Sequence, residues 1–178
     1  RYQGMRPTLQ VTGLSRRFRG HLARADVPFP VTAASITGLL GRHGAGQSTL
    51  MRILAAQEFA SAGHVSILGG SPVENDAILR RMVLVREDQT FPDIKVGQAL
   101  RAASWFYPNW SDELAATLTT EFELPANRAI KKLSRGMRSA LGIVIGLAAR
   151  AEVTLLDEPY AGLDAVARQL FYDHLLAD

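Results

Sequence analysis

The sequence predicts an α/β fold with a parallel sheet at its centre. Three short apolar runs, at residues 36–40, 82–85 and 153–156, have the length and composition of buried strands. Stretches with helical spacing of apolar residues separate these runs, and the clearest, at residues 48–59, follows a glycine-rich loop. That loop follows the first run and two acids follow the third, at the strand ends where parallel sheets bind ligands.

Composition and charge exclude several classes of protein. Hydrophobic residues make up 47% and charged residues 21% of the chain, which indicates a globular domain rather than a disordered segment. The net charge of +3 is too small to indicate a nucleic-acid partner. The absence of cysteine excludes disulfides and thiolate metal sites. The longest apolar run, residues 140–149, is shorter than the ~20 residues of a membrane span, and residues 1–10 lack the apolar core of a signal peptide.

The first part of the chain indicates a small antiparallel sheet. Residues 8–14 and 63–68 alternate between apolar and polar, as half-buried strands do, and Gly69-Gly70 ends the second of them. The arginines at 16, 17 and 19 are expected in a solvated turn. Phe18 stands between them, and its ring could stack on a nucleotide base.

A phosphate-binding loop is indicated at residues 41–49, which nearly fit the pattern G-x-x-x-x-G-K-[ST]. Gly41, Gly44 and Gly46 allow the backbone to bend tightly and to bring its N–H groups close to an anion. The loop leads into the expected helix, whose N-terminus attracts phosphate. Gln47 occupies the position where the pattern has lysine.

Asp157 and Glu158 follow the third apolar run, at the carboxyl end of the expected strand. Beside a bound phosphate, two acids suit a metal ligand and a base that activates water. A plain turn at the strand end is the alternative interpretation, and the phosphate loop elsewhere in the chain favours the functional one.

Residues 93–128 are rich in alanine, leucine and aromatic residues. Two helices are expected there, at 96–106 and 111–122, and Ser111 can cap the second. Four aromatic side chains are expected in the core rather than on a binding surface: Trp105, Phe106, Tyr107 and Trp110.

Three further helices are expected. A short one ends at residues 78–81, and a longer one at 137–150 contains Gly142 and Gly146, where another backbone is expected to approach closely. After the third apolar run, Asp164 can cap a last helix. One face of that last helix carries the apolar residues Val166, Leu170, Phe171 and Leu175.

Four segments together resemble the ATP-binding cassette (ABC) ATPases, in the family's order and over nearly the whole chain. Residues 41–49 resemble the Walker A loop, and residues 153–158 resemble the Walker B strand with its Asp-Glu ending. Residues 133–137, Leu-Ser-Arg-Gly-Met, look like a variant of the signature L-S-G-G-Q, and residues 161–164 resemble the D-loop. The segment 99–133 looks most like ATPase subunits of bacterial multidrug or polyketide-type exporters.

The resemblance implies a P-loop NTPase core with a parallel sheet, a small antiparallel β subdomain and an inserted helical subdomain. The whole chain, residues 1–178, is expected to form one incomplete ABC domain. Residues of about 1–35 and 60–75 would form the β subdomain and about 93–150 the helical subdomain, with the nucleotide-binding core as the remainder.

The resemblance also implies how ATP and Mg²⁺ would be bound. Phe18 occupies the place of the aromatic residue that stacks on adenine. Ser48 would ligate Mg²⁺, and Thr49 would reach the α-phosphate. Gly41 is also expected at the phosphates. The backbone of the four residues Gly44, Ala45, Gly46 and Gln47 would cradle the β-phosphate.

Catalytic and partner-facing roles are implied for four more residues. Asp157 would hold Mg²⁺ through water, and Glu158 would orient or deprotonate the attacking water. Ser134 and Gly136 would cap the γ-phosphate bound by a second cassette in a head-to-tail pair. One chain is therefore expected to build only part of a site.

Three features depart from the family pattern. Gln47 replaces the phosphate-binding lysine. By spacing, the family's loop glutamine falls near Arg86; Gln89 is the expected catalytic glutamine because it is close by, and Glu87 is a competing candidate. The family's switch histidine lies roughly thirty residues beyond the Walker B glutamate, past Asp178, so the domain is expected to be truncated at its C-terminus.

The resemblance implies the ATP-binding subunit of an ABC transporter, of exporter type, that couples hydrolysis of Mg-ATP to transport. Its expected partners are a second cassette and a separate membrane-spanning subunit, with no nucleic acid. We expect it in the cytoplasm, peripheral on the inner face of the cell membrane. The alternative is a nucleotide-binding module that dimerises on ATP without efficient turnover. A role in DNA repair or translation would favour a coiled-coil insertion or paired cassettes, and neither is visible in the sequence.

Overall fold

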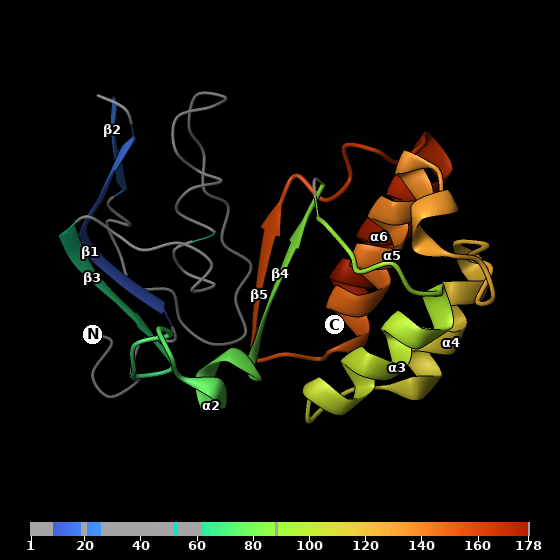
Figure 1. Cartoon of the computed structure of the whole chain (residues 1–178), viewed down its shortest axis with the longest axis horizontal. Helices are drawn as coiled ribbons and strands as arrows, with labels where there is room; N and C mark the ends of the chain where they lie inside the picture. Colours follow the sequence, from blue (N-terminus) through green and yellow to red (C-terminus); the bar gives the residue numbers. More distant parts are fainter. Residues whose placement is uncertain (1–8, 19–20, 26–51, 53–61, 88, 178) are drawn as a thin grey trace. The chain divides into compact units, whose positions relative to one another are not determined.

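A computed structural model divides the chain into two compact units, residues 1–82 and residues 83–178. The structure describes residues 9–18, 21–25, 52, 62–87 and 89–177, and Figure 1 draws the others as a grey trace. The strand expected at 36–40, the phosphate loop, and all but Arg52 of the helix expected at 48–59 lie outside the described residues.

The first unit contains a small antiparallel sheet, as the alternating segments predict. Its strands, in the spatial order β2-β1-β3, are β1 (Leu9–Phe18), β2 (His21–Ala25) and β3 (Ala62–Ile67). Leu9 of β1 lies opposite Ile67 of β3, and both side chains are buried, as is that of Val11. This buried row confirms the face predicted from the alternation.

β1 is longer than the alternation predicts. It continues through Arg16 and Arg17 to Phe18, which pairs with His21 of β2. The prediction of a solvated turn is therefore wrong at these two arginines. In this stretch the backbone of β1 forms hydrogen bonds with that of β2, which requires no particular side chains. The alternation of apolar and polar residues therefore does not reveal this pairing.

The end of β3 agrees with the prediction that Gly69-Gly70 closes the strand. Ile67 and Gly70 exchange two backbone hydrogen bonds, with N···O distances of 2.8 and 3.0 Å. Gly69 has a φ of +86°, which glycine adopts without a steric penalty. The short helix α2 (Asp76–Leu79) follows, and the side chain of its N-cap, Asn75, accepts a hydrogen bond from the Ile78 N–H at 3.3 Å.

The second unit combines helices with a two-stranded sheet of β4 (Met82–Arg86) and β5 (Val153–Asp157). Met82, the first residue of β4, belongs to the first unit. Both strand arrows point the same way in Figure 1, as the prediction of a parallel sheet requires. The helices are α3 (Val96–Phe106), α4 (Asp112–Glu121), η1 (Ile130–Lys132), α5 (Arg135–Ala148) and α6 (Ala165–Ala177).

Several of these bounds confirm the sequence patterns. β4 and β5 each extend one residue beyond their apolar runs, and α3 spans the predicted residues. Ser111 caps α4 by accepting a hydrogen bond from the Leu114 N–H at 3.1 Å, and Asp164 accepts one from the Ala167 N–H at 2.8 Å. Side-chain capping therefore marks both of these helix starts.

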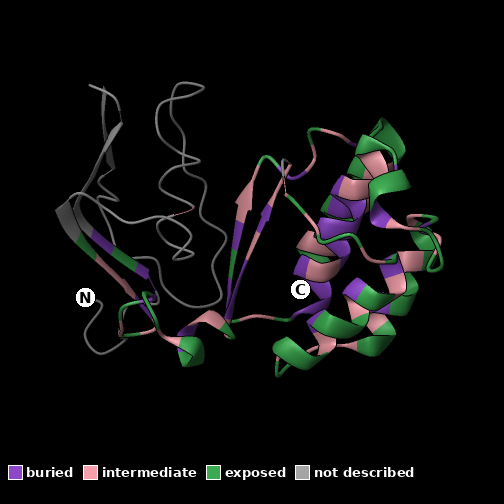
Figure 2. Cartoon of the chain, viewed as in Figure 1, coloured by how far each residue is buried: buried purple, intermediate pink, exposed green. Residues whose placement is uncertain are grey.

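The core of the second unit is organised around α5. Nine of its 14 residues are buried, and Figure 2 shows this burial along most of the helix. Val85 of β4, Leu118 of α4 and Phe171 of α6 join it in one hydrophobic cluster. The long apolar run at 140–149 is thus a core helix, and no helix among the described residues is long and apolar enough to cross a membrane.

Gly142 and Gly146 mark a close approach, as predicted, but the neighbours are side chains rather than another backbone. A Cβ added at Gly146 would lie 2.2 Å from a methyl carbon of Val85. A Cβ at Gly142 would lie 3.2 Å from Oε1 of Gln89 and 3.8 Å from the other Val85 methyl. The prediction of a backbone neighbour is therefore wrong, because β4 presents Val85 to the surface of α5.

The prediction of a buried aromatic cluster is wrong for two of its four members. Trp105 is 76% and Phe106 41% exposed, because α3 turns Val96, Ala99 and Ala103 toward the core instead. Tyr107 and Trp110 do pack against the core. Burial raises the pKa of the Tyr107 hydroxyl above its ordinary value of 10.0.

The last helix also differs from its predicted apolar face. Phe171 is 1% exposed and Leu175 packs against the core, but Val166 is 79% exposed. Val166 lies in the first turn of α6, and the core-facing side of the helix is carried by Ala167 and Phe171. A hydrogen-bonded contact of 2.6 Å between His174 Nε2 and Glu121 Oε2 joins α6 to α4.

Candidate functional site

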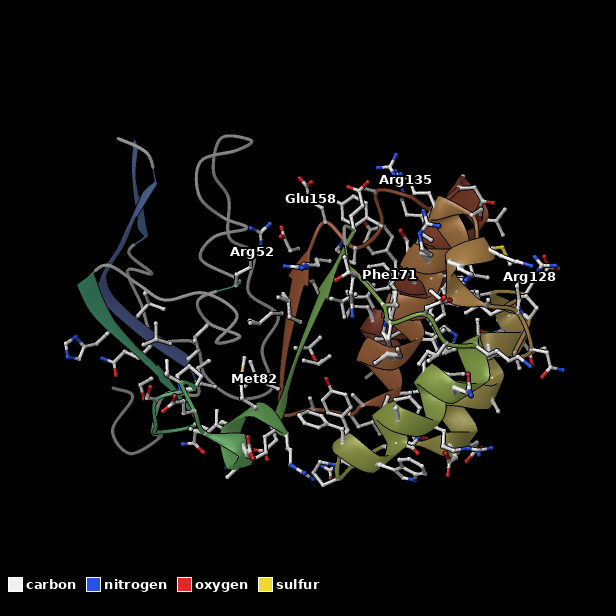
Figure 3. All side chains as sticks on the ribbon, in the orientation of Figure 1. Arg52, Met82, Arg128, Arg135, Glu158 and Phe171 are labelled. Atoms are coloured by element: carbon white, nitrogen blue, oxygen red, sulfur yellow. The ribbon has the colours of Figure 1, made fainter. Side chains whose placement is uncertain are left out.

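Asp157 and Glu158 lie at the carboxyl end of β5. Asp157 is the last residue of the strand and is half-buried, whereas Glu158 is exposed. Glu158 has a φ of +46°, in the left-handed region, although a residue before proline normally favours an extended backbone. Backbone strain of this kind costs on the order of 1–3 kcal/mol and clusters at functional sites. Figure 3 shows Glu158 at the end of β5.

The N-terminus of α5 carries the signature-like residues. The helix starts at Arg135, two residues earlier than predicted, because Ser134 is its N-cap and accepts a hydrogen bond from the Met137 N–H at 3.2 Å. Arg138 donates a hydrogen bond of 2.6 Å to the Leu133 carbonyl, which fixes the segment leading into the helix. Ser134 and Arg135 remain exposed, so this first turn can meet a ligand or a partner.

The first turns of α5 pack tightly onto the loop that follows β5. A Cβ added at Gly136 would lie 2.9 Å from the Gly162 carbonyl oxygen, and one at Gly162 would lie 2.6 Å from Oγ of Ser139. Both positions therefore need glycine for this approach. Ser139 is 3% exposed, and its Oγ has no hydrogen-bond partner among the described residues.

The loop after β4 carries the two candidates for the family's loop glutamine. The Oε1 atom of Gln89 is buried against Gly142 of α5 and has no hydrogen-bond partner within the described part of the chain. Glu87 forms an ion pair with Arg135 at the start of α5. Both side chains therefore face α5, from the same loop.

The structure brings the predicted site residues together in part. Ser134, Gly136 and the loop following Glu158 lie at one end of the second unit, and Figure 3 shows Glu158 and Arg135 at that end. The phosphate-loop residues Gly41, Gly44, Ala45, Gly46, Gln47, Ser48 and Thr49 lie outside the described residues. The backbone of Phe18 ends β1, and its side chain is not among those described.

Sequence reasoning missed the contacts of Arg135. The sequence carried a signal for them, since an arginine stands where the resembling signature has glycine and an acid, Glu87, follows β4. Nothing in the sequence pattern places those two charges beside each other, because the contact depends on how α5 packs on β4.

The acids at the end of β5 fit a magnesium site in their donor chemistry. Within the described residues, no group of three or more histidine or acidic side chains could hold a metal ion. Mg²⁺ bound with a nucleotide needs only one or two carboxylates, because phosphates and waters supply the other oxygens. Asp157 and Glu158 offer such oxygen ligands.

Comparison with known sequences places this chain in a family. Residues 25–161 match the sequence profile described as ABC transporter. The chain belongs to the ABC transporter family. The matched residues span the segments that resemble Walker A, the signature and Walker B, so membership of the family and the P-loop NTPase fold are confirmed. The ATP-binding domains of this family are ATPases.

Two relatives and one solved structure illustrate the similarity. The doxorubicin resistance ATP-binding protein DrrA of Mycobacterium tuberculosis is 33% identical over 159 residues, covering 85% of this chain and 48% of that protein. The sulfate/thiosulfate import ATP-binding protein CysA of Bordetella pertussis is 30% identical over 173 residues, covering 91% of this chain and 49% of that protein. A solved structure of an ATP-binding subunit of an ABC transporter is 24% identical, with a TM-score of 0.82, over 94% of this chain and 73% of that one. The chain thus spans about half the length of these two ABC transporter proteins known by sequence.

Proposed function

We propose that this chain is the ATP-binding part of an ABC exporter that couples hydrolysis of Mg-ATP to transport through a separate membrane subunit. The observation that carries the proposal is the apposition of two motif segments, the first turn of α5 and the loop after the β5 acids. The drug-resistance name of DrrA favours export, while CysA is named as an importer, so the direction rests on the segment 99–133 as well.

In this proposal the residues have the roles that the family resemblance implies. Glu158 orients or deprotonates the attacking water, and Gln89 or its neighbour Glu87 completes the water site. Asp157 and Ser48 hold Mg²⁺, which neutralises phosphate charge when bound. The phosphate loop binds through backbone N–H groups and Phe18 stacks on the adenine.

The proposed assembly is a head-to-tail pair of cassettes on the cytoplasmic face of a membrane. Ser134 and Gly136 of one chain would meet the γ-phosphate held by the other, and both lie at a helix start whose N–H groups attract anions. The division into β subdomain, helical subdomain and core belongs to the same proposal.

A second candidate is a module that binds ATP and dimerises but hydrolyses it poorly. One residue favours it: Gln47 stands where the phosphate-binding lysine belongs, and its amide carries no charge. The two candidates share ATP binding and differ in turnover.

Weak but measurable binding of Mg-ATP is expected for the unaltered chain, since the loop backbone and Ser48 remain. A charge-assisted hydrogen bond contributes about 1.5–3 kcal/mol, so Gln47→Lys should tighten binding roughly ten- to a hundredfold. Isothermal titration calorimetry on both proteins measures the difference. Equal affinities would show that residue 47 does not contact the phosphates.

Dimerisation is expected to depend on ATP. In the Gln47→Lys, Glu158→Gln double variant, unhydrolysed ATP should bridge two chains and raise the light-scattering mass to that of a dimer. Adding Ser134→Arg should return the mass to that of a monomer, because a bulky charge would stand at the γ-phosphate. A monomer at saturating ATP in the double variant would contradict the head-to-tail pair.

A further inference from the structure

Arg135 makes two contacts with different parts of the second unit. Its guanidinium forms an ion pair with Glu87, which follows β4. Its aliphatic stem lies close to Gly162, in the loop after β5: a Cβ added at Gly162 would lie 3.4 Å from Arg135 Cγ. The carbonyl oxygen of Arg135 is 3.5 Å from the same point. One side chain is thus paired with the loop after β4 and lies close to the loop after β5.

In the proposed function, Gln89 and Glu158 act on the attacking water, and each of these two loops carries one of them. Gln89 lies two residues after Glu87, and Glu158 lies four residues before Gly162. The loop after β5 is closed by backbone hydrogen bonds from the Ala161 N–H to the Glu158 carbonyl at 3.2 Å and from the Leu163 N–H to the Tyr160 carbonyl at 2.9 Å. A displacement of Gly162 would therefore also displace Glu158, because both residues lie in the turn that these hydrogen bonds hold together.

We propose that Arg135 is a positioning residue that ties the loop after β4 to the loop after β5, so that Gln89 and Glu158 are held in a fixed mutual arrangement. The effect on turnover rests on the proposed function, whereas the mechanical link between the loops does not. A glycine at 135, as in the signature that this segment resembles, has no side chain to make either contact.

The link acts through geometry more than through added stability. The side chain of Arg135 is 67% exposed and that of Glu87 28%, so solvent screens the ion pair. A planar guanidinium holds a carboxylate in a defined orientation, however, and its stem packs against the neighbouring backbone. We therefore expect small changes in unfolding and larger changes in the local opening of the two loops.

Hydrogen exchange of the nucleotide-free chain tests the link directly. Glu87→Gln removes the ion pair without touching Gly162, yet the amide protons of Ala161 and Leu163 should exchange about three- to fivefold faster, as expected for loss of a partly exposed ion pair. Arg135→Ala should produce at least the same acceleration. In the Arg135→Ala background, Glu87→Gln should add nothing, because the connecting side chain is already gone.

Two further variants separate positioning from a general loss of structure. Lys131→Ala breaks an ion pair of 2.7 Å with Asp93, which follows Glu87 in the loop after β4, but leaves the Arg135 contacts in place, so the Ala161 and Leu163 amides should be unchanged. Arg135→Lys keeps the charge and the aliphatic stem, so it should restore most of the protection that Arg135→Ala removes. Unchanged exchange at these amides in Glu87→Gln would overturn the proposal, and so would an equal effect of Lys131→Ala.

Turnover in a Gln47→Lys background supplies the functional readout. Arg135→Ala should lower the rate of phosphate release about fivefold, while ATP affinity stays within about twofold. A lower rate at nearly unchanged affinity is expected for a group that positions the catalytic side chains and does not bind ATP. Loss of affinity in step with the rate would mean that Arg135 contacts the nucleotide, which would overturn the positioning role. If none of the variants binds ATP, the proposed function fails, and the exchange data still decide whether the link exists.

Discussion

Replacing Gln47 by lysine is expected to restore ATP binding more than turnover, and to raise the rate of ATP hydrolysis from a level near background. One preorganised donor to developing charge typically contributes about 10²–10³ in rate where the rest of the site is complete, which sets the upper bound of the gain. Phosphoryl transfer depends mainly on positioning and on stabilising charge. A lysine at 47 would hold the β- and γ-phosphates as charge moves toward the leaving oxygen, and glutamine supplies no positive charge. Steady-state phosphate release on the two proteins measures the gain.

Two controls show where this gain arises. Gln169→Lys makes the same substitution at an exposed position on α6, where the glutamine donates to Asp173 at 2.8 Å, and should leave the rate at background. Glu158→Gln should abolish the activity that Gln47→Lys creates. Brisk hydrolysis by the unaltered chain would contradict the prediction and would indicate that another cation, such as Arg42, replaces the lysine.

Gly146→Ala is expected to destabilise the chain by about 3 kcal/mol, at the upper end of the usual range for overpacking. The added methyl would lie 2.2 Å from a methyl carbon of Val85, well inside contact distance, and α5 and β4 are both held in the core. The helix cannot relieve the clash by a rotamer change, because alanine has none. Urea denaturation of both proteins gives the difference in free energy of unfolding.

A second substitution tests whether Val85 is the cause. Val85→Ala alone leaves a cavity and should destabilise, but Gly146→Ala should cost much less in that background, giving a coupling energy of about 1–3 kcal/mol. Gly142→Ala is the matched control on the same helix. Its nearest neighbour is the side-chain oxygen of Gln89 at 3.2 Å, and the higher helix propensity of alanine offsets the contact, so stability should change little. If the effects of Val85→Ala and Gly146→Ala on the free energy of unfolding are additive, contact with Val85 is not the cause of the destabilisation.

The sequence predicts the elements whose signals are local. Continuous apolar runs located β4 and β5 within one residue, and caps such as Ser111 and Asp164 located helix starts. These features depend on burial on both faces of a strand and on side chains bonding to nearby backbone, and both leave a mark in a few consecutive residues.

The errors come from contacts between distant segments. Trp105 and Phe106 are apolar, but the core side of α3 is carried by smaller residues and leaves both exposed. The close approach at Gly146 comes from Val85, some sixty positions earlier in the chain. In the candidate site, motifs locate Asp157 and Glu158 at the end of β5 and Ser134 before α5, whereas the proposed link through Arg135 depends on packing that no motif encodes.

In the proposed function, folding and chemistry make opposite demands on Glu158. At a φ of +46° a glycine would fit with less strain, and a glutamate adds a long side chain that must be ordered for any catalytic role. Selection for stability alone would therefore favour glycine at this position. If the proposed role is correct, the chain gives up part of its small margin of stability to keep a carboxylate here, and its thermal robustness and its activity cannot both be maximised at residue 158.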